Sequence, residues 1–510
     1  MNNREIEAAW TYHNGTKHPG GALMNPYHQY QPALDPLPFK IYEGLEKIPL
    51  PLAASPLGMP ALAAIAKDTK SIEGEHIPDI DDLSRILYFS AGVTKKIEYE
   101  WGSMYFRAAA CTGALYHIEL YVVCGDLPGL AAGVYHYEPQ AQALTVMRQG
   151  DYRRVLIEAS GDEPAMEVAP AILMFSDVYW RNAVKYQARE YRHTYWDGGT
   201  ILSHTLTVCA ALDLPARVVM GFEDDAVNQL LSFDVEEEAA FALVPIGNGP
   251  EMLAPPAPER IETLNVEIMP IGGRTPVKFQ PIFEMHEASM LHSHDEAAAW
   301  RSAEVPSFEM PEPQSELIPL SPSEPTDRDL SEVILHRGST RVFMREPISF
   351  AQLSTLLRQS LQGVPTDYSG SLVTPYLIVN EVDGLEQGSY VYLRSGEALE
   401  LLSAGNFRRQ AGDLALGQDL AADAAVDVYF LTDLNRLIDA YGNRGYRASQ
   451  LEAATEAGRM YLAAYAQKFG ASGLTFFDDA VTRFFSPHAE GQSAMFLIAL
   501  GHKAKRRSGL

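Results

Sequence analysis

Apolar positions along the chain fall into runs of two lengths, which predict both strands and helices. The short runs, dominated by branched and aromatic side chains, have the length of buried strands and cover 120–124, 171–175, 376–379 and 426–431. Two longer segments, 192–212 and 447–468, carry alanine and leucine in the manner of buried helices. The mixture predicts an α+β fold.

The second half of the chain repeats the first. Tyr135 and Tyr390, Tyr152 and Phe407, and Tyr186 and Tyr441 are each 255 residues apart, and Asp225 and Asp479 are 254 apart. Four matches in one order at a nearly constant separation indicate two copies of one domain. Asp225 and Asp479 each follow a predicted long helix, and we expect both to cap the helix that comes next.

Length and composition agree with a two-domain protein. A chain of 510 residues exceeds what one hydrophobic core usually supports. The repeat assigns residues 1–250 to copy one and 327–510 to copy two. Residues 251–326 are rich in proline, glutamate and serine and predict a linker that does not pack continuously. We expect the copies to be related by a pseudo-twofold axis, with the two long helices at their shared interface.

The charge balance excludes one class of partner. The net charge of −26 argues against nucleic acid, because phosphates need a basic surface. A basic cluster near the end of the chain is the exception, and it is either a solvated tail or a binding group; it comprises Lys503, Lys505, Arg506 and Arg507. No apolar run approaches the roughly 18 residues of a membrane helix.

Cysteine and histidine positions predict neither a disulfide framework nor a metal site. The three cysteines are Cys111, Cys124 and Cys209. They are too few and too scattered for either structure. His286, His292 and His294 cluster in the linker, but histidines in a polar segment are usually solvated. The first residues are acidic and polar, unlike a signal peptide, so a cytoplasmic location is expected.

Function is sought where the copies differ, because shared residues are explained by the shared fold. From Val93 to Tyr135 is 42 residues, whereas the equivalent stretch from Val364 to Tyr390 is 26. The extra residues include 107–116, in which small side chains surround a glycine. Such a loop lets backbone amides approach a flat ligand. The alternative is a tight turn that leads into the next strand.

Two further differences carry charge. Copy one has Lys185 before Tyr186, where copy two has Ala440; the pair is either an acid–base pair or an exposed lysine beside a structural tyrosine. Copy two contains the stretch 336–341, His-Arg-Gly-Ser-Thr-Arg, whose guanidiniums and hydroxyls suit a phosphate. The alternative for this stretch is a pair of surface arginines. Copy one has His-Asn-Gly-Thr-Lys-His at 13–18.

These residues resemble a known family. Arg337, Ser339 and Arg341 resemble the phosphate motif of the nitroreductase superfamily. Residues 107–116 are similar to the flavin-ring loop of its SagB/ThcOx-type dehydrogenase branch, and residues 185–192 to that branch's Lys-Tyr signature. The chain departs from the pattern at Ala110, Cys111 and Thr200, where proline, serine and histidine are usual.

The resemblance implies two tandem nitroreductase-like domains that form an intrachain pseudo-dimer with one FMN between them. Copy one would supply the ring loop through Arg107, Cys111, Thr112 and Gly113. Copy two would supply the remaining cofactor-binding residues, Arg337, Ser339, Arg341, Gly473, Leu474, Lys503 and Lys505. The reciprocal site, which would pair Lys17 and His18 with residues 369–371, looks degenerate.

The branch oxidises thiazoline or oxazoline rings of peptides to azoles, so the resemblance implies a peptide or other small substrate and other biosynthetic enzymes as partners. Lys185 and Tyr186 would be the catalytic residues, and the ammonium is expected to lower the pKa of the phenol so that it accepts a proton. Two alternatives stay open: an NAD(P)H-dependent nitro- or quinone reductase, and a flavin-binding pseudoenzyme that scaffolds a biosynthetic complex.

Overall fold

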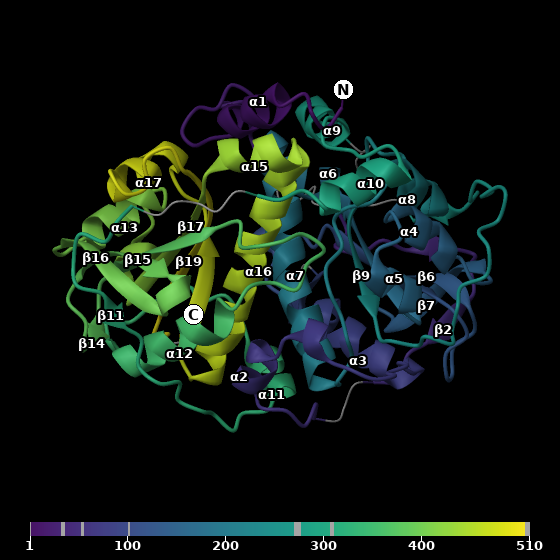
Figure 1. The fold of residues 1–510 in the computed structure, drawn as a ribbon, viewed down its shortest axis with the longest axis horizontal. Helices are drawn as coiled ribbons and strands as arrows, with labels where there is room; N and C mark the ends of the chain where they lie inside the picture. Colours follow the sequence, from purple (N-terminus) through teal and green to yellow (C-terminus); the bar gives the residue numbers. More distant parts are fainter. Residues whose placement is uncertain are drawn as a thin grey trace.

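The computed structural model describes residues 2–31, 36–52, 56–99, 102–269, 277–305 and 311–504. Figure 1 shows two mixed helix-and-sheet halves side by side, with α7 (Glu190–Ala211) and α16 (Arg444–Ala466) between them. No helix in these ranges is long and apolar enough to cross a membrane. The α+β organisation expected from the sequence is confirmed.

Copy one contains an antiparallel sheet of six strands in the order β2-β7-β6-β5-β8-β9. Its strands are β2 (Lys47–Pro49), β5 (Ile118–Cys124), β6 (Gly133–Glu138), β7 (Ala143–Gln149), β8 (Ala171–Val178) and β9 (Glu238–Ile246). Every residue of β5, β8 and β9 is buried. Continuous burial explains why these strands read as unbroken apolar runs instead of an alternating pattern.

Copy two repeats this sheet and extends it to seven strands, in the order β11-β16-β15-β13-β17-β19-β18. The strands are β11 (Ile318–Pro319), β13 (Thr374–Val379), β15 (Gly388–Leu393), β16 (Ala398–Ala404), β17 (Val426–Thr432), β18 (Gly470–Leu474) and β19 (Ser493–Gly501). The four strands expected from apolar runs are all present, as β5, β8, β13 and β17.

The long helices α7 and α16 pack against each other along the boundary between the copies. A Cβ placed on Gly199 of α7 would lie 2.6 Å from the Cβ of Ala454, and one on Gly458 of α16 would clash with Ser203. Trp196 donates a hydrogen bond to Gln450 across the contact (2.6 Å). Small residues allow this close approach, so the expected interface helices are confirmed, with ends that differ by one to three residues.

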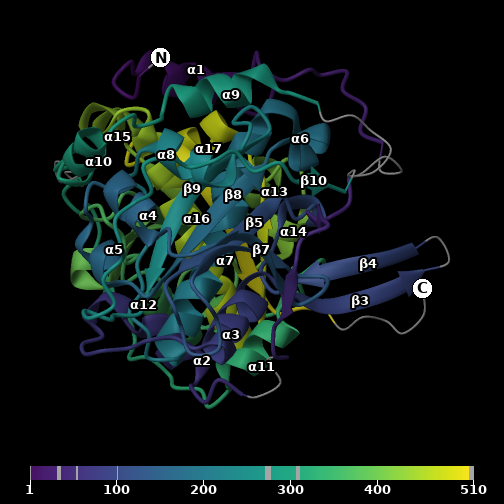
Figure 2. The same cartoon turned by 90° about the vertical axis from the view of Figure 1, so that its right-hand side faces the viewer.

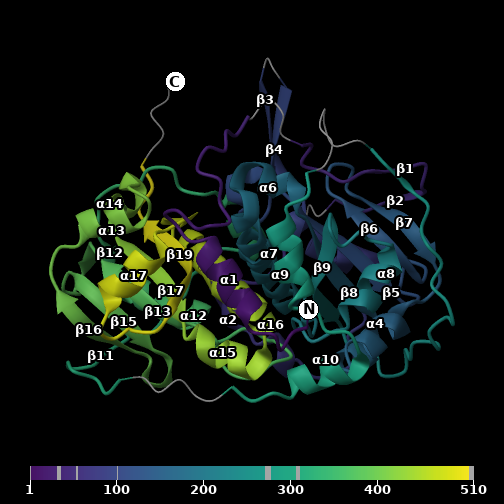
Figure 3. The ribbon, with the colours of Figure 1, turned by 90° about the horizontal axis from the view of Figure 1, so that it is seen from above.

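Shorter helices cover the sheets and the boundary. Those of copy one are α2 (Ala61–Ala66), α3 (Ile80–Ala91), α4 (Arg153–Ala159), α5 (Pro164–Val168), α6 (Trp180–Tyr186) and α8 (Asp224–Leu231). Those of copy two are α11 (Leu330–His336), α12 (Phe350–Ser360), α13 (Arg408–Leu414), α14 (Asp419–Asp423), α15 (Leu434–Tyr441) and α17 (Asp478–Phe485). Figure 3 shows α1 (Glu7–Gly15) lying over the boundary between the halves.

The extra segment of copy one is a β-hairpin as well as a loop. Strands β3 (Val93–Tyr99) and β4 (Gly102–Arg107) pair antiparallel and project from the body of the protein (Figure 2). The single turn η3 (Thr112–Ala114) follows and leads into β5. The sequence indicated an insertion but not the hairpin, because the strands are exposed in part and carry charge along with apolar residues.

The segment 251–326 is more than a linker. It contains α9 (Gln280–Glu287) and α10 (His294–Arg301), and its β11 joins the sheet of copy two. Trp300 is buried and donates to the carbonyl oxygen of Tyr441 (3.0 Å). Composition misses this packing because a few apolar side chains anchor an otherwise polar segment. The three histidines of the segment have separate partners: His286 lies beside Tyr179 and Tyr191, His292 pairs with Asp225, and His294 pairs with Asp162 and Asp295.

The expectation that Asp225 and Asp479 cap helices is wrong. Both are exposed and form surface pairs, Asp225 with His292 (3.1 Å) and Asp479 with Lys17 (2.7 Å). The residues that cap α8 and α17 make no side-chain capping bond. The preceding aspartate of each pair is the buried one.

Asp224 and Asp478 join the two copies through reciprocal ion pairs. The carboxylate of Asp478 accepts hydrogen bonds from Arg189 (3.2 Å) and Arg192 (2.6 Å) of the other copy. Asp224 pairs with the equivalent arginines of copy two, Arg444 (2.6 Å) and Arg447 (3.0 Å). All six side chains are buried. These contacts explain why the Tyr-x-x-Arg-x-Tyr-Arg pattern is repeated: its arginines join each copy to the other.

Candidate active site between the copies

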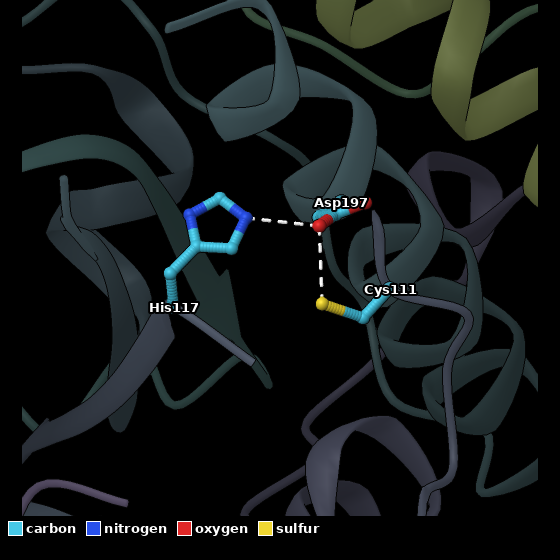
Figure 4. Close-up of side chains that lie close together, drawn as sticks. All are labelled: Cys111, His117 and Asp197. Atoms are coloured by element: carbon cyan, nitrogen blue, oxygen red, sulfur yellow. Dashed lines mark hydrogen bonds and ion pairs between the residues drawn. The ribbon is translucent and has the colours of Figure 1, made fainter. Parts of the chain in front are cut away.

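The loop that carries Cys111, Thr112 and Gly113 is tied to Asp197 of α7. The backbone amide of Thr112 donates to the Asp197 carboxylate (2.8 Å), and so do the Thr112 hydroxyl (2.8 Å) and the Cys111 thiol (3.1 Å). Figure 4 shows the carboxylate between Cys111 and His117. The polar hydrogens of Thr112 are thus committed to α7, and the Cys111 side chain points inward.

His117 also contacts the carboxylate of Asp197. Its Nε2 lies 2.9 Å from Asp197, and its Nδ1 lies 2.7 Å from Asp177 and 3.2 Å from Glu190. Burial alone would lower the pKa of His117, but the carboxylates raise it well above its ordinary value. An imidazole with a carboxylate on each ring nitrogen is satisfied only when both nitrogens carry protons.

This cluster also has the composition of a metal site, but hydrogen bonds occupy it. Ligand atoms of Cys111, His117 and Asp197 lie within 4.8 Å of one another. Burial and Asp197 raise the pKa of the Cys111 thiol well above its ordinary value, so the protonated sulfur donates a hydrogen bond to Asp197. We therefore assign the cluster to the support of the loop.

Lys185 and Tyr186 converge on Gly113. Gly113 has a φ of +66°, a conformation that favours glycine. A Cβ at this position would lie 2.9 Å from the Tyr186 hydroxyl oxygen and 3.3 Å from Lys185 Nζ. A side chain here would therefore displace both functional groups. The structure brings together the loop glycine and the pair that the sequence singled out separately.

The expected lowering of the Tyr186 pKa is not found. Burial raises the pKa of the Tyr186 phenol well above its ordinary value, and Asp197 and Cys111 raise it further, whereas Arg341 of copy two lowers it. The hydroxyl is therefore a proton donor at neutral pH. Sequence reasoning considered only the adjacent ammonium and had no measure of burial. The contribution of Arg341 indicates that this exposed arginine of copy two lies near Tyr186 of copy one.

Arg337 of copy two reaches the loop of copy one. Its Nε donates to the carbonyl oxygen of Ala108 (2.8 Å), and its guanidinium lies over the ring of Tyr461 (5.8 Å to the centroid). The hydroxyls of Ser339 and Tyr461 are 3.4 Å apart. The two elements that the sequence assigned to opposite halves of one site, the stretch 337–341 and the loop of copy one, are therefore in contact.

Two tyrosines of α16 organise the copy-two side of the site. The Tyr461 hydroxyl accepts a hydrogen bond from the amide of Gly473 (2.5 Å), beside Leu474 at the end of β18. The Tyr465 hydroxyl donates to the carbonyl oxygen of Gly338 (2.6 Å), and Lys503 Nζ lies 4.9 Å from the centroid of the Tyr465 ring. Lys505 lies outside the described residues. Sequence reasoning missed both tyrosines, although their four-residue spacing on a helix was a signal.

Arg107 supports the loop from inside copy one. Its guanidinium donates to the carbonyl oxygen of Pro38 (2.5 Å) and lies between the rings of Phe39 and Tyr116. Burial lowers its pKa. The Arg107 side chain thus supports the loop, and its part in binding a cofactor stays a prediction.

Two buried hydroxyls on the copy-two side lack a hydrogen-bond partner in the described part of the chain. Among the described residues, the side-chain oxygens of Thr340 and Thr475 are buried and have no hydrogen-bond partner. Thr340 follows Ser339, and Thr475 follows Leu474. Buried hydroxyls normally find partners, so these two fit a ligand with acceptor or donor groups, such as a phosphate or a flavin. Sequence reasoning missed Thr475.

The reciprocal site differs from the one proposed from sequence. Residues 60–61 of copy one pair with residues 329–330 of copy two across the boundary, where α2 and α11 begin. The segment after α2 is therefore the counterpart of the segment after α11. The position equivalent to Arg337 is then Asp68, which an anionic phosphate would avoid. Lys17 instead pairs with Asp479, and the amide of His18 donates to Asp478 (2.9 Å).

Two buried glutamates lie at the reciprocal position. Glu452 stands where copy one has Asp197 and accepts from a backbone amide of the shorter loop (2.7 Å). Glu456 stands where copy one has Ile201, and it pairs with Arg394 (2.6 Å). Burial and Glu456 raise the pKa of Glu452 to about 7. The reciprocal position thus has neither the arginines nor the small-residue loop of the candidate site.

Comparisons with known proteins agree with this architecture. The model of the nitroreductase family matches residues 334–502. A protein of Methanocaldococcus jannaschii described as a "putative nitroreductase" is 26% identical over 166 residues, which cover 32% of this chain and 79% of that protein.

One solved structure extends the likeness to both copies. The crystal structure of a "putative nitroreductase" from Anabaena variabilis is 27% identical, covers 98% of this chain and 99% of its own, and superposes with a TM-score of 0.76. One from Ralstonia eutropha covers 43% of this chain and 98% of its own, at 20% identity and a TM-score of 0.32. Residues 334–502 match the nitroreductase family model, and the whole chain has a tandem nitroreductase-like fold.

Proposed function

We propose that this protein is an FMN-dependent oxidoreductase that oxidises azoline rings of a peptide to azoles. Two observations carry the proposal: Lys185 and Tyr186 converge on Gly113, and Arg337 of copy two donates to backbone carbonyls of the same loop. A family match to copy two and a full-length structural likeness support the oxidoreductase class.

The residues of the boundary fit a flavin in chemical type. Arg337, Ser339 and Arg341 would hold the phosphate, with Lys503 adding charge and Thr340 and Thr475 offering unpaired hydroxyls. Gly113 would let the ring approach the loop backbone. FMN, when bound, supplies a hydride acceptor. The protein's part is to hold the substrate ring in place and to manage the proton.

Lys185 is the residue that we assign to the proton. Tyr186 holds its own proton at neutral pH, so its hydroxyl would donate a hydrogen bond to the substrate instead of acting as the base. Among the described residues, no carboxylate lies within ion-pair distance of Lys185 Nζ. In its neutral amine form, the nitrogen would take the proton that leaves the azoline ring.

The test is anaerobic mixing of the flavin-loaded protein with a thiazoline-containing peptide. We expect the flavin absorbance to bleach in a single turnover and a thiazole, two mass units lighter, to form. Bleaching by NADPH but not by the azoline peptide would replace the proposal with a nitro- or quinone reductase. Bleaching by neither would favour a flavin-binding pseudoenzyme.

A further inference from the structure

Gln187, directly after Tyr186, has a backbone conformation that normally requires glycine. Its φ is +52° and its ψ is −142°. The equivalent residue of copy two, 255 positions later, is Gly442, with φ +67° and ψ −161°. The two copies therefore share one bend at the end of α6 and α15. Copy one forms it with a side chain in a strained region, which implies that the side chain has a use.

The Gln187 side chain clasps a distant backbone segment. Its Oε1 accepts a hydrogen bond from the amide of Asn25 (2.7 Å), and its Nε2 donates to the carbonyl oxygen of the same residue (3.2 Å). His28 adds a hydrogen bond from Nε2 to the carbonyl oxygen of Val184 (2.8 Å). Residues 25–30, which we call the strap, are thereby held across the end of α6.

The strap ends at Tyr30, whose ring faces Lys185. Lys185 Nζ lies 4.9 Å from the centroid of the Tyr30 ring and 5.1 Å from that of Tyr186. A cation between two aromatic faces is attracted to both. The same nitrogen is 3.3 Å from the Cβ position of Gly113. Tyr30 is thus placed to fix where the nitrogen of Lys185 lies above the loop.

We propose that the strap is one wall of the substrate site and that Tyr30 is a positioning residue that holds Lys185 over Gly113. Gln187 keeps its strained backbone because a glycine would lose the clasp. The proposal deepens the proposed function and rests on it for the identity of the reaction. The placement of Lys185 by the strap is a separate physical claim.

Chemical labelling of Lys185 tests the placement without a substrate. Acetylation by an N-hydroxysuccinimide ester, followed by mass spectrometry, reports how well the nitrogen is shielded. We expect Tyr30→Leu to raise the labelling rate of Lys185 by about tenfold, the scale of one cation–aromatic contact. Tyr30→Phe keeps the ring and should label like the wild type. Equal labelling in all three proteins would overturn the assignment.

Hydrogen exchange tests the clasp. Gln187→Gly relieves the backbone strain but removes both hydrogen bonds, so we expect faster amide exchange across residues 25–30 with no loss of thermal stability. Tyr27→Ala is the matched control, because its side chain is exposed and takes no part in the clasp. Unchanged exchange in Gln187→Gly, or equal loss of protection in Tyr27→Ala, would contradict the strap.

Turnover then connects the strap to the reaction. With flavin bound equally, Tyr30→Leu should lower kcat for azoline oxidation by about tenfold, and Tyr30→Phe should restore it. If Tyr30 had only a structural role, both Tyr30→Leu and Tyr30→Phe would lower the flavin content or the stability of the protein. If the wild type oxidises no azoline, the proposed function fails, whereas labelling and exchange still decide the strap.

Discussion

Replacing Lys185 with alanine is expected to leave flavin bound and to slow azoline oxidation by about 10²- to 10⁴-fold, the usual loss when a general acid–base group is removed. The nitrogen is beside Gly113 and between two rings, and no equivalent exists in copy two, which has Ala440. Tyr186→Phe should also slow the reaction, through loss of the hydrogen bond from its protonated hydroxyl. Single-turnover flavin reduction measures both.

The repeat supplies the control. Tyr441 is the counterpart of Tyr186 and lies in the copy without the lysine, so Tyr441→Phe should reduce flavin at nearly the wild-type rate. A normal reduction rate in Lys185→Ala at saturating peptide would remove the catalytic assignment. Weaker peptide binding with normal turnover would instead make Lys185 a substrate-binding cation.

Replacing Asp478 with asparagine is expected to lower the free energy of unfolding by about 3–5 kcal/mol, the usual effect of removing one partner from a buried ion pair. The change leaves Arg189 and Arg192 buried beside a neutral group. Chemical denaturation followed by circular dichroism measures the loss. Asp224→Asn should have a similar effect, because Arg444 and Arg447 surround it in the same way.

The neighbouring residue is the control for this prediction. Asp479 is exposed and pairs with Lys17 at the surface, so Asp479→Asn should cost at most about 1 kcal/mol. Burial alone would raise the pKa of Asp478, but Arg189 and Arg192 hold it below its ordinary value. Its stabilising contribution is therefore present above the ordinary aspartate pKa of about 4 and is lost as the pH falls. Equal losses in Asp478→Asn and Asp479→Asn would contradict the interface assignment.

The sequence predicts the architecture well because the fold is present twice. Strand-forming runs such as 171–175 and 426–431 occur at equivalent places, and each supports the interpretation of the other. The loop, the Lys185–Tyr186 pair and the stretch 337–341 were identified as differences between the copies. Local pattern was sufficient for these features, since each lies within a few consecutive residues.

Features that depend on distant contacts were missed or misassigned. The caps were assigned to Asp225 and Asp479, because nothing local separates two adjacent aspartates. Asp224 and Asp478 are the buried members of each pair because they contact arginines of the other copy. The copy-one counterpart of the phosphate-binding stretch was placed at Lys17 and His18 instead of the segment after α2, because the spacing between equivalent residues changes near the start of each copy. The raised pKa of Tyr186 depends on burial, which the sequence does not report.

The ratio of flavin to chain tests most directly the central claim that both copies build one site. After saturation with FMN and desalting, the absorbance spectrum should give one flavin per chain. Arg337→Ala with Arg341→Ala should give none, and Lys67→Ala with Lys70→Ala, in the equivalent segment of copy one, should still give one. Two flavins per chain, or retention by the double arginine variant, would contradict the account.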